Sequence, residues 1–495
     1  MVSTANFLAV DIGAESGRCM LGSFNGECIG LREIHRFNNS PIRLLDRLHW
    51  DVLRLFTEVK NGLAKSVQEC GSGLTGFGLD TWGVDFALLD EQGELLGNPY
   101  HYRDNQTKGM LEEAFRRMPR EEIYQQTGIQ FMRLNSLYQL LALEARKSPL
   151  LFTAKTFLMV PDLFNYWFTG QKVCEYTDAS TSQCLDAVTR DWAWSLLDRM
   201  NIPTHIFPQI IQPGSVLGEL LPSIAEEIGA KGLPVIATAT HDNASALASI
   251  SRESEGYLSS GTWSVVGTEL IEPIINDITL RFNFTNEGGV CGTISLFKNI
   301  MGLWLIQECR RTWALEGDDL SYNEISQLAA GAPAFAAVID PDSTEFLTPG
   351  DMPARIRDYC RRTGQKVPDT PGAIARTIFE SLALKYRWVF ERLEQILERH
   401  LDTLQIIGGG SQNRLQNQFV ANAINRPVIA GPFEATTIGN LLMQMLALGF
   451  VSSLEEGRQL VKCSFQTETY LPQETGSWDE AYPRLINQIG SVMLG

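Results

Sequence analysis

The chain has 495 residues, of which 44% are hydrophobic and 20% are charged, and its formal net charge is −17. This length exceeds what a single hydrophobic core usually serves, so we expect two large domains. The acidic balance argues against nucleic acids and anionic membranes as default partners, because both attract basic surfaces.

Cysteine, histidine and apolar patterns point to a cytoplasmic protein. The nine cysteines are scattered without C-x-x-C spacing, which is typical of reduced thiols, and the six histidines lack the spacing of a transition-metal site. No apolar run approaches the roughly eighteen residues of a membrane span, and no basic segment with an apolar core opens the sequence. We therefore expect no membrane partner.

The first predicted element is a β-hairpin. An apolar run from Phe7 ends at Asp11, turns through small residues between Gly13 and Gly17, and continues into a second β-prone run to Leu21. Such a turn exposes backbone N–H groups that bind phosphate, and a carboxylate at its base is suited to holding Mg²⁺. An ordinary edge hairpin is the alternative, and this hairpin alone does not separate the two.

The next elements are a third strand, a helix and a glycine-rich loop. Residues 28–37 read as a strand, and apolar residues at helical spacing follow Asp51. Residues 71–76 match G-x-G-x-x-G, but a dinucleotide-binding fingerprint requires a strand before it and a helix after it. Here a helical pattern precedes the motif and a strand-like run follows, so we interpret it as a helix stop and loop.

Residues 77–90 predict a strand pair that is interrupted at residues 80–86. That interruption contains Asp80, Trp82, Gly83 and Asp85. Carboxylates beside an aromatic face suit a polyol, whereas a β-bulge with solvated acids is the competing interpretation. Both remain open on this segment alone.

Asp242 lies between a predicted buried strand and a predicted short helix. The unbroken apolar run of residues 235–239 predicts the strand, and small residues after Asp242 predict the helix. A carboxylate between a strand and a helix is aimed well for proton transfer, but it is equally a helix N-cap.

The second half repeats the opening pattern. Residues 256–267 again read as a strand, a small-residue turn and a strand. Thr370-Pro371 then predicts the start of a long helix to about residue 400, followed by a strand, the glycines 408–410 and further helix–strand alternation. Two such hairpins indicate a duplicated α/β architecture with two similar lobes and a cleft between them.

These motifs resemble a known superfamily. Residues 11–17, 259–264 and 406–410 resemble the two phosphate motifs and the adenosine motif of the actin-like ATPases, and within that superfamily the chain resembles the FGGY carbohydrate kinases. The specific signals are Arg32–Asn38, Leu79–Phe86, Tyr257–Ser264, Asn286–Gly289 and Lys298–Trp304. Together they extend from about residue 7 to about residue 450.

The resemblance implies a fold and an activity. It implies two ribonuclease-H-like domains with a catalytic cleft between them, an N-terminal one over residues 1–244 and a C-terminal one over residues 245–495. It implies an ATP-dependent, Mg²⁺-requiring ketose kinase, most similar to the members that phosphorylate L-rhamnulose at its 1-hydroxyl. A kinase for another ketose, such as L-fuculose or L-xylulose, and an inactive sugar- and nucleotide-binding regulator are the alternatives. Nothing in the sequence decides between a monomer and a small homo-oligomer.

The resemblance also assigns the expected site residues. Asp242 is the expected catalytic base, and Asp11 is the expected Mg²⁺ anchor. The expected ketose contacts are Gly83, His241, Asp242, Asn243 and Asn299, and Asp85 is added to them only because it lies close to Gly83 in the sequence. The expected ATP contacts are Ala14, Glu15, Ser16, Gly17, Arg18, Thr262, Gln307 and Gly409. Family members often have Thr at the position of Asn243 and Ser at that of Glu15, so these two contacts depart from the pattern.

Overall fold

Two compact units share the chain. The computed structural model describes residues 4–70, 73–251 and 255–493. The first unit consists of residues 1–251, 269–296 and 435–465, and the second of residues 252–268, 297–434 and 466–495. The first unit extends to residue 251, a few residues beyond the expected boundary at 244/245. It also includes two later segments, residues 269–296 and 435–465.

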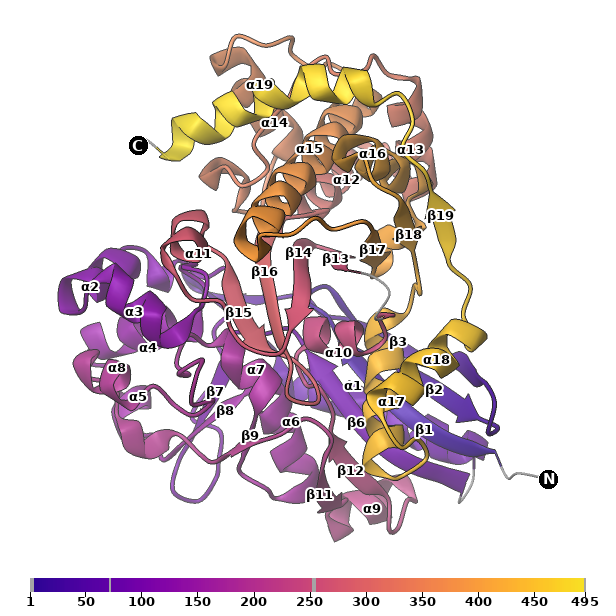
Figure 1. Cartoon of the computed structure of the whole chain (residues 1–495). Coiled ribbons are helices and arrows are strands. Elements are labelled where there is room, and N and C mark those ends of the chain that lie inside the picture. The colour runs from indigo at the N-terminus through magenta and orange to yellow at the C-terminus, as the bar shows by residue number, and fades with distance from the viewer. Residues whose placement is uncertain (1–3, 71–72, 252–254, 494–495) are drawn as a thin grey trace. The chain divides into compact units, whose positions relative to one another are not determined.

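A six-stranded mixed sheet, in the order β11-β12-β6-β1-β2-β3, forms the centre of the first unit (Figure 1). The hairpin β1–β2 and the ladder β2–β3 are antiparallel, β6 runs parallel to β1, β12 runs parallel to β6, and β11 is antiparallel to β12. The predicted opening hairpin and third strand are thereby confirmed. The strands are β1 Ala5–Ile12, β2 Ser16–Phe24, β3 Ile29–Asn38, β6 Leu74–Thr81, β11 Ser215–Glu219 and β12 Pro234–Ala237.

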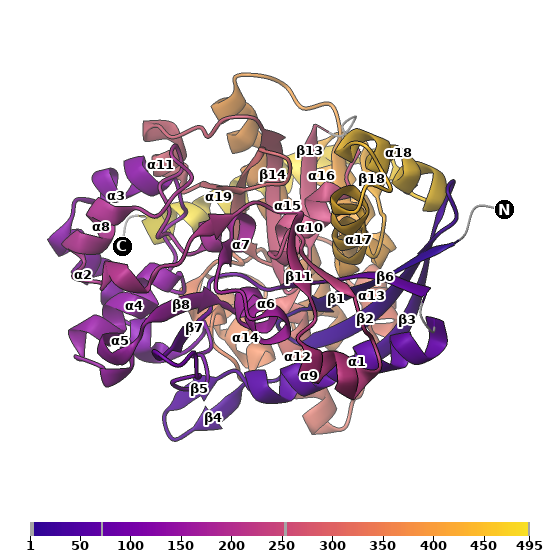
Figure 2. The same cartoon turned by 90° about the horizontal axis from the view of Figure 1, so that it is seen from below.

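Helices cover both faces of this sheet. A Cβ atom at Gly22 would meet Leu441 of α17 (Ala435–Ala447), whereas a Cβ atom at Gly62 of α1 (Val52–Cys70) would meet Cys19. Positions 19 and 22 of β2 face opposite sides, because side chains alternate along a strand. Figure 2 accordingly shows α17 and α1 on opposite sides of β1 and β2.

Close packing joins α10 (Asp242–Ala248) to α17. A Cβ atom at Gly439 of α17 would collide with the backbone oxygen of Ser245 in α10, so glycine is required at this crossing. Arg458 of α18 (Leu454–Ser464) donates to the backbone oxygens of Leu247 and Ala248, which are among the carbonyls that the end of a helix leaves without partners. The middle and the C-terminal end of this short helix are therefore held by tertiary contacts.

The segment after β6 departs from the predicted strand pair. Instead of pairing with β6, β7 (Phe86–Leu89) pairs antiparallel with β8 (Thr156–Met159) in a separate sheet. Val84 has a φ of 68°, a left-handed conformation that is rare for a β-branched residue, and it redirects the chain.

The glycine-rich loop is confirmed as a helix stop followed by a strand. Helix α1 ends at Cys70 and β6 begins at Leu74. Gly71 and Ser72, the first two residues of the motif, lie outside the described residues.

The other elements of the first unit flank its sheet. They are β4 Ile42–Leu44, β5 Arg47–His49, α2 Met110–Arg117, α3 Arg120–Thr127, α4 Ser136–Ala145, α5 Pro149–Thr153, α6 Val160–Thr169, β9 Cys174–Glu175, α7 Tyr176–Thr181, α8 Trp194–Arg199, β10 Ile210–Ile211, α9 Pro222–Ile228, α11 Asp277–Phe282 and β15 Thr285–Gly288.

The sheet of the second unit repeats the plan of the first. Its strands are part of a seven-stranded sheet, in which they follow the order β16-β14-β13-β17-β18-β19. The hairpin β13–β14 is antiparallel, β17 and β18 add in parallel, and β19 closes the edge in antiparallel orientation. These directions match those from β2 through β1, β6 and β12 to β11, which confirms the predicted duplication. The strands are β13 Gly256–Ser260, β14 Trp263–Leu270, β16 Ile294–Met301, β17 Leu404–Ile407, β18 Val428–Ala430 and β19 Glu468–Tyr470.

A long central helix organises the second unit. In α15 (Pro371–Leu397) the Thr370 side chain accepts a hydrogen bond from Ala373 N, as the predicted cap requires. Helices α13, α16 and α19 contact α15. The other helices of this unit are α12 Trp304–Glu316, α13 Tyr322–Gly331, α14 Met352–Arg362, α16 Arg414–Ile424 and α19 Thr475–Met493.

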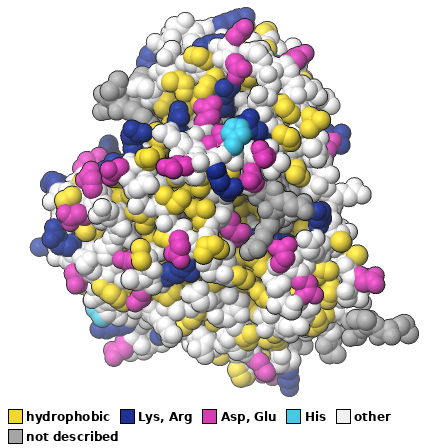
Figure 3. All heavy atoms as spheres, viewed as in Figure 1, with side chains coloured by type: hydrophobic (Ala, Val, Ile, Leu, Met, Phe, Trp, Pro, Cys, Tyr) yellow, Lys and Arg dark blue, Asp and Glu magenta, His cyan; other side chains and the backbone are white. Residues whose placement is uncertain are grey.

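The surface mixes charges of both signs. On the face drawn in Figure 3, acidic and basic side chains are interspersed.

Within the described part of the chain, no helix combines the length and the apolar character that crossing a bilayer requires. All nine cysteines are free thiols.

Candidate functional site

The turn of the first hairpin is fixed by hydrogen bonds from outside it. Gly13 N donates to Ser16 O at 3.0 Å, and the side chain and backbone of Asn39 donate to Gly13 O and Glu15 O, each at 2.8 Å. Asn39 follows β3, so the third strand holds the turn of the first two. A turn held this firmly presents its backbone in one conformation, which a phosphate-binding turn requires.

Two carboxylates meet at the base of this hairpin. Asp11 accepts from Arg18 Nε at 3.1 Å and from Arg18 Nη2 at 2.8 Å. Asp80 lies opposite Asp11 in the parallel β1–β6 ladder and accepts from Asn440 Nδ2 at 2.6 Å. Burial, followed by the charge of Asp11, raises the pKa of Asp80 well above its usual range. Arg18, an expected phosphate contact, is therefore paired with the expected Mg²⁺ anchor.

The donors near Asp11 fit Mg²⁺ only in combination with a nucleotide. The carboxylates of Asp80 and Asp242 interact electrostatically with Asp11. No group of three or more His, Cys, Asp or Glu side chains among the described residues could by itself hold a metal ion. Mg²⁺ commonly binds through one or two carboxylates together with substrate phosphates and water, so this donor set suits it.

Asp242 is the first residue of α10, directly after the N-cap His241. The sequence left open whether Asp242 caps this helix, and the structure puts His241 at the cap position instead. The Asp242 side chain is 36% exposed. Burial, and next the charge of Asp11, raise its pKa to about 7. A partly exposed carboxylate with such a pKa is suited to accept a proton near neutral pH.

The backbone before Asp242 is anchored by buried groups. Thr81 N donates to Thr240 O at 2.8 Å, which ties the loop to the end of β6. Glu175 Oε2 accepts from Thr240 N at 2.9 Å and from Thr240 Oγ1 at 2.6 Å, and His241 N donates to Thr177 Oγ1 at 3.2 Å. The position of Asp242 is thus set by β6 and by the segment around β9 and α7.

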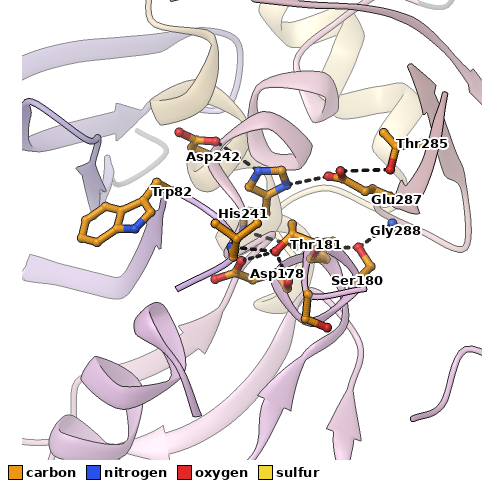
Figure 4. A network of polar contacts seen from close by, with 12 residues as sticks. Trp82, Asp178, Ser180, Thr181, His241, Asp242, Thr285, Glu287 and Gly288 are labelled. Atoms are coloured by element: carbon orange, nitrogen blue, oxygen red, sulfur yellow. Dashed lines mark hydrogen bonds and ion pairs between the residues drawn. The ribbon is translucent and has the colours of Figure 1, made fainter. Parts of the chain in front are cut away.

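The His241 ring lies between two carboxyl groups (Figure 4). Its Nε2 is 3.5 Å from Asp242 Oδ1, and its Nδ1 is 3.4 Å from Glu287 Oε2. Burial lowers the pKa of His241 to about 4, so the ring is neutral at pH 7. Burial also raises the pKa of Glu287 to about 8, against a hydrogen bond from Thr285 that lowers it.

The expected sugar loop is tightly constrained. A Cβ atom at Gly83 would lie 2.8 Å from Thr181 Cγ2 and 2.9 Å from Thr181 Oγ1. The same hydroxyl oxygen accepts from Val84 N at 2.8 Å, and Ser136 Oγ donates to Val84 O at 2.5 Å. These bonds hold the left-handed conformation of Val84 in place.

Asp85 is fully buried and occupied by protein donors. Its carboxylate accepts from Trp50 Nε1 at 2.5 Å, Trp82 Nε1 at 3.0 Å, Gln139 Nε2 at 2.8 Å and Tyr102 N at 3.2 Å. Burial raises its pKa to about 7 in spite of these bonds. The sugar contact expected of Asp85 stays a prediction, whereas its contacts with two indoles give it a structural role.

Asn243 carries a buried acceptor. The residue is 7% exposed, and its Oδ1 accepts no hydrogen bond from the described residues. A buried polar atom without a partner costs free energy, so it calls for a ligand or water. This supports the expected ketose contact at the position that departs from the family pattern.

In the second unit, α12 buttresses the turn of the second hairpin. Gly261 N donates to Trp263 O at 3.0 Å, Leu303 N donates to Gly261 O at 2.9 Å, and Trp304 N donates to Thr262 O at 3.1 Å. One turn further along α12, Gln307 Oε1 is buried without a hydrogen-bond partner among the described residues. The start of α12 therefore brings two expected ATP contacts, Thr262 and Gln307, to one end of β13 and β14.

The triple glycine reaches the same end of β13. Gly408 has a φ of 80°, and a Cβ atom there would lie 2.9 Å from Ser260 O. A Cβ atom at Gly410 would collide with Ser260 Oγ, whereas one at Gly409 would meet nothing within 4 Å. Two glycines thus pack on β13, and the third, the expected nucleotide contact, faces open space.

The expected sugar contact Asn299 lies on β16 and is partly buried.

Each unit gathers its own share of the expected residues. The first unit brings together Asp11, the hairpin turn, Asp80, His241, Asp242 and Asn243. Sequence reasoning missed the roles of Asn39, Thr181 and Glu287. Asn286–Gly289 was a recognised motif, and its two glycines were the available signal for a close backbone approach next to Glu287.

Family models match nearly all of the chain. The N-terminal domain of the FGGY family of carbohydrate kinases matches residues 6–249, and the C-terminal domain of the same family matches residues 256–448.

The chain is also similar, over nearly its whole length, to proteins that share one name. The chain is 45% identical over 484 residues to a rhamnulokinase of Bacteroides thetaiotaomicron, covering 97% of this chain and 99% of that protein. It is 41% identical over 475 residues to a rhamnulokinase of Enterococcus faecalis, covering 95% of this chain and 94% of that protein.

Solved structures share the fold at low sequence identity. A gluconate kinase from Lactobacillus acidophilus superimposes with a TM-score of 0.82 at 19% identity, covering 99% of this chain and 98% of that chain. Plasmodium falciparum glycerol kinase with ADP superimposes with a TM-score of 0.77 at 15% identity, covering 98% of each chain. These likenesses establish the two-domain fold of the sugar kinases.

Proposed function

The chain belongs to the FGGY family of carbohydrate kinases, and we propose that it transfers the γ-phosphoryl group of ATP to the 1-hydroxyl of L-rhamnulose. The observation that carries this proposal is an identity of 41–45% over nearly the whole length to proteins named rhamnulokinase. ATP is the co-substrate of this family.

We assign Asp242 as the catalytic base. Its carboxylate takes the proton of the ketose 1-hydroxyl while that oxygen attacks the γ-phosphorus, and the bond to the β–γ bridging oxygen breaks to release ADP. The support is chemical and positional: Asp242 begins α10, keeps part of its surface open, and has a pKa near 7. An inactive sugar-binding protein needs no such base.

We assign the ketose contacts to the two loops beside Asp242. Asn243 offers a buried acceptor, and Gly83 packs against Thr181 so closely that its loop keeps one shape. We also assign ketose contacts to His241, which lies next to the base, and to Asn299 of β16. Asp85 would act indirectly, because it holds the indole of Trp82 through a hydrogen bond. Such polar contacts discriminate among sugars, because a missing hydroxyl leaves a buried polar group unpaired.

We assign the nucleotide to two groups of backbone and side-chain donors. In the first unit these are Ala14, Glu15, Ser16, Gly17 and Arg18, and in the second unit they are Thr262, Gln307 and Gly409. The rigid first turn supports this assignment, and so does the buried Gln307 Oε1, which has no hydrogen-bond partner in the described part of the chain. Mg²⁺ would be held by Asp11 together with the phosphates, where it supplies positive charge to the transferred group.

The expected division of labour between domains remains part of this proposal. Residues 1–244 would supply most ketose contacts, the base and the first hairpin, and residues 245–495 the second hairpin and the adenosine motif. A monomer or a small homo-oligomer serves this activity equally well, and we propose a cytoplasmic location because the substrates are cytoplasmic metabolites.

A ketose panel tests the proposal. Purified protein is incubated with ATP, Mg²⁺ and L-rhamnulose, L-fuculose or L-xylulose, and ADP release is measured by a coupled assay. We expect the highest kcat/KM for L-rhamnulose. A higher kcat/KM for L-fuculose would overturn the substrate assignment, and ADP release with none of the ketoses would overturn the kinase activity itself.

A further inference from the structure

Glu287 occupies a strand that is docked closely on a helix. Gly288 N, in β15, donates to Ser180 Oγ of α7 at 2.8 Å. A Cβ atom at Gly288 would lie 2.5 Å from the ring of Tyr176, also in α7, so only glycine allows this approach. The backbone on the C-terminal side of Glu287 is therefore fixed, and with it the direction of the Glu287 side chain.

That side chain ends at the His241 ring. It is 8% exposed, and its Oε1 accepts from Thr285 Oγ1 at 3.3 Å. Its Oε2 lies 3.4 Å from His241 Nδ1 and makes no hydrogen bond to any described residue, so this buried oxygen is open to a hydrogen bond with the ring. The opposite ring nitrogen faces Asp242, so a carboxyl, an imidazole and a carboxylate follow one another, as Figure 4 shows.

Only one distribution of protons over Glu287, His241 and Asp242 leaves Asp242 ionised and gives both ring nitrogens a favourable contact. A neutral imidazole has a single N–H, so it cannot donate to two ionised carboxylates. If Nδ1 carries the proton, the lone pair of Nε2 faces Asp242, and that contact is favourable only when Asp242 is already protonated. If Nε2 carries the proton, it donates to ionised Asp242, and Glu287 has to be the protonated partner that donates to Nδ1.

The surroundings of Glu287 agree with the second arrangement. Burial raises the pKa of Glu287, and the charge of Asp242 raises it further; among the described residues, no cation is a cause that lowers it. Thr285 on β15 and His241 before α10 are its polar neighbours. Asp178 of α7 is turned to Thr181, whose Oγ1 lies 3.3 Å from its Oδ1.

We propose that Glu287 is a positioning residue for phosphoryl transfer, acting through His241 on Asp242. As a neutral acid it donates to His241 Nδ1 and fixes the tautomer whose Nε2–H faces Asp242. That N–H occupies one oxygen of the Asp242 carboxylate and leaves the other oriented toward the ketose hydroxyl. This inference rests on the proposed role of Asp242 as the base.

Two variants of similar size separate the hydrogen bond from the packing. Glu287→Gln keeps a donor for Nδ1 in its amide nitrogen and an acceptor for Thr285 in its amide oxygen, whereas Glu287→Met fills the space without a donor. We expect Glu287→Met to lower kcat about 10- to 100-fold with KM for ketose and ATP little changed, less than the loss of the base itself. Glu287→Gln is expected to recover most of that loss.

The pH profile gives a readout that packing alone does not change. In the wild type, kcat is expected to fall above about pH 8, because ionised Glu287 no longer donates to His241. Glu287→Gln has no proton to lose there and is expected to lack this fall. The same alkaline limb in both proteins would contradict the proposal.

Nitrogen NMR of histidine observes the tautomer directly. In protein with ¹⁵N-labelled histidine, His241 is assigned by comparison with His241→Asn. We expect the Nε2–H tautomer in the wild type and in Glu287→Gln, and a mixture of tautomers in Glu287→Met. Thermal unfolding of each variant confirms that it is folded.

Asp242→Asn, measured alongside, distinguishes the two possible failures. If Asp242→Asn is inactive while Glu287→Met turns over at the wild-type rate, the inference about Glu287 is overturned and the base assignment stands. If Asp242→Asn turns over normally, the base assignment fails, and with it the catalytic role of Glu287. An Nδ1–H tautomer in the wild type overturns the inference whatever the rates are.

Discussion

Asp242 combines two properties that rarely occur together. Its carboxylate is surrounded closely enough for its pKa to rise to about 7, yet 36% of its side chain stays open to a substrate. Replacing it by Asn preserves the shape and removes the proton acceptor. We expect Asp242→Asn to lower kcat at least about 10²-fold, the lower end for loss of a general base, while ATP binding measured by calorimetry is retained.

The pH dependence of the wild type checks the same assignment. Because the base works only when ionised, kcat/KM is expected to fall with decreasing pH below about 7, tenfold per pH unit. Turnover of Asp242→Asn near the wild-type rate would mean that the carboxylate serves the helix rather than the reaction.

Gly83 illustrates how a missing side chain fixes a loop. An added methyl group would lie 2.8 Å from Thr181 Cγ2, inside normal contact distance. Overpacking of this kind costs about 1–3 kcal/mol. We expect Gly83→Ala to raise KM for the ketose about tenfold or more while KM for ATP is unchanged.

Thr181→Ser supplies the matched control for Gly83. Serine keeps the hydroxyl that accepts from Val84 N and removes Cγ2, the nearest of the Thr181 atoms that would crowd the new methyl group. The double variant is therefore expected to recover part of the ketose affinity. An unchanged ketose KM in Gly83→Ala would show that this loop does not shape the sugar site.

Among the helices, α17 crosses the middle of α10 closely and holds it in place. Gly439→Ala would drive a methyl group into the backbone oxygen of Ser245. Backbone cannot move aside as a side chain can, so we expect a loss of at least about 2 kcal/mol in unfolding free energy, measured in denaturant. Gly490→Ala in α19, where a Cβ atom meets nothing within 4 Å, is the control and is expected to leave stability unchanged or raise it.

Elements with local signals were predictable from sequence, whereas partners distant in the chain were not. Thr370 caps α15 as predicted, and the two glycine-turn hairpins lie where their sequences indicated. The partner of β7 was wrong, because Val84 takes a left-handed conformation that no sequence rule favours for valine.

The candidate site shows the same limit. The resemblance to the family supplied Asp242 and its immediate neighbours. Glu287 lies within the motif Asn286–Gly289, but the sequence does not indicate its role, because its contact with His241 exists only after β15 has docked on α7. The role of Asn39 was not predictable for the same reason, because its side chain bonds to Gly13 O in the hairpin turn, which is distant in the sequence.

At the scale of the whole molecule, buried carboxyl groups link stability to pH. Folding raises the pKa of Asp85 and Asp242 to about 7 and of Glu287 to about 8, above the values near 4 of an unfolded chain. The folded protein therefore binds more protons than the unfolded one between about pH 4 and pH 8. Stability from these groups is fully present below pH 4 and is lost as the pH rises through 7 and 8.

Thermal unfolding of the ligand-free protein tests this linkage. We expect the Tm to decrease from pH 6 to pH 9, and the decrease to be smaller in Asp242→Asn, which lacks one of the carboxyl groups whose pKa is raised by folding. The net charge of −17 acts in the same direction as the remaining acids ionise. A Tm that rises over this range would show that these groups are ionised at little cost in the folded protein.

In the proposed reaction, the γ-phosphoryl group of ATP is transferred to the 1-hydroxyl of L-rhamnulose. Phosphorus NMR of the product from protein, Mg²⁺, ATP and L-rhamnulose tests it most directly, because a phosphate on a primary carbon is split by two protons and one on a secondary carbon by a single proton. We predict a new phosphomonoester signal split by the two C1 protons, formed together with ADP and formed at least about 10²-fold more slowly with Asp242→Asn. A signal split by one proton, or ADP formed without any sugar phosphate, would contradict the account.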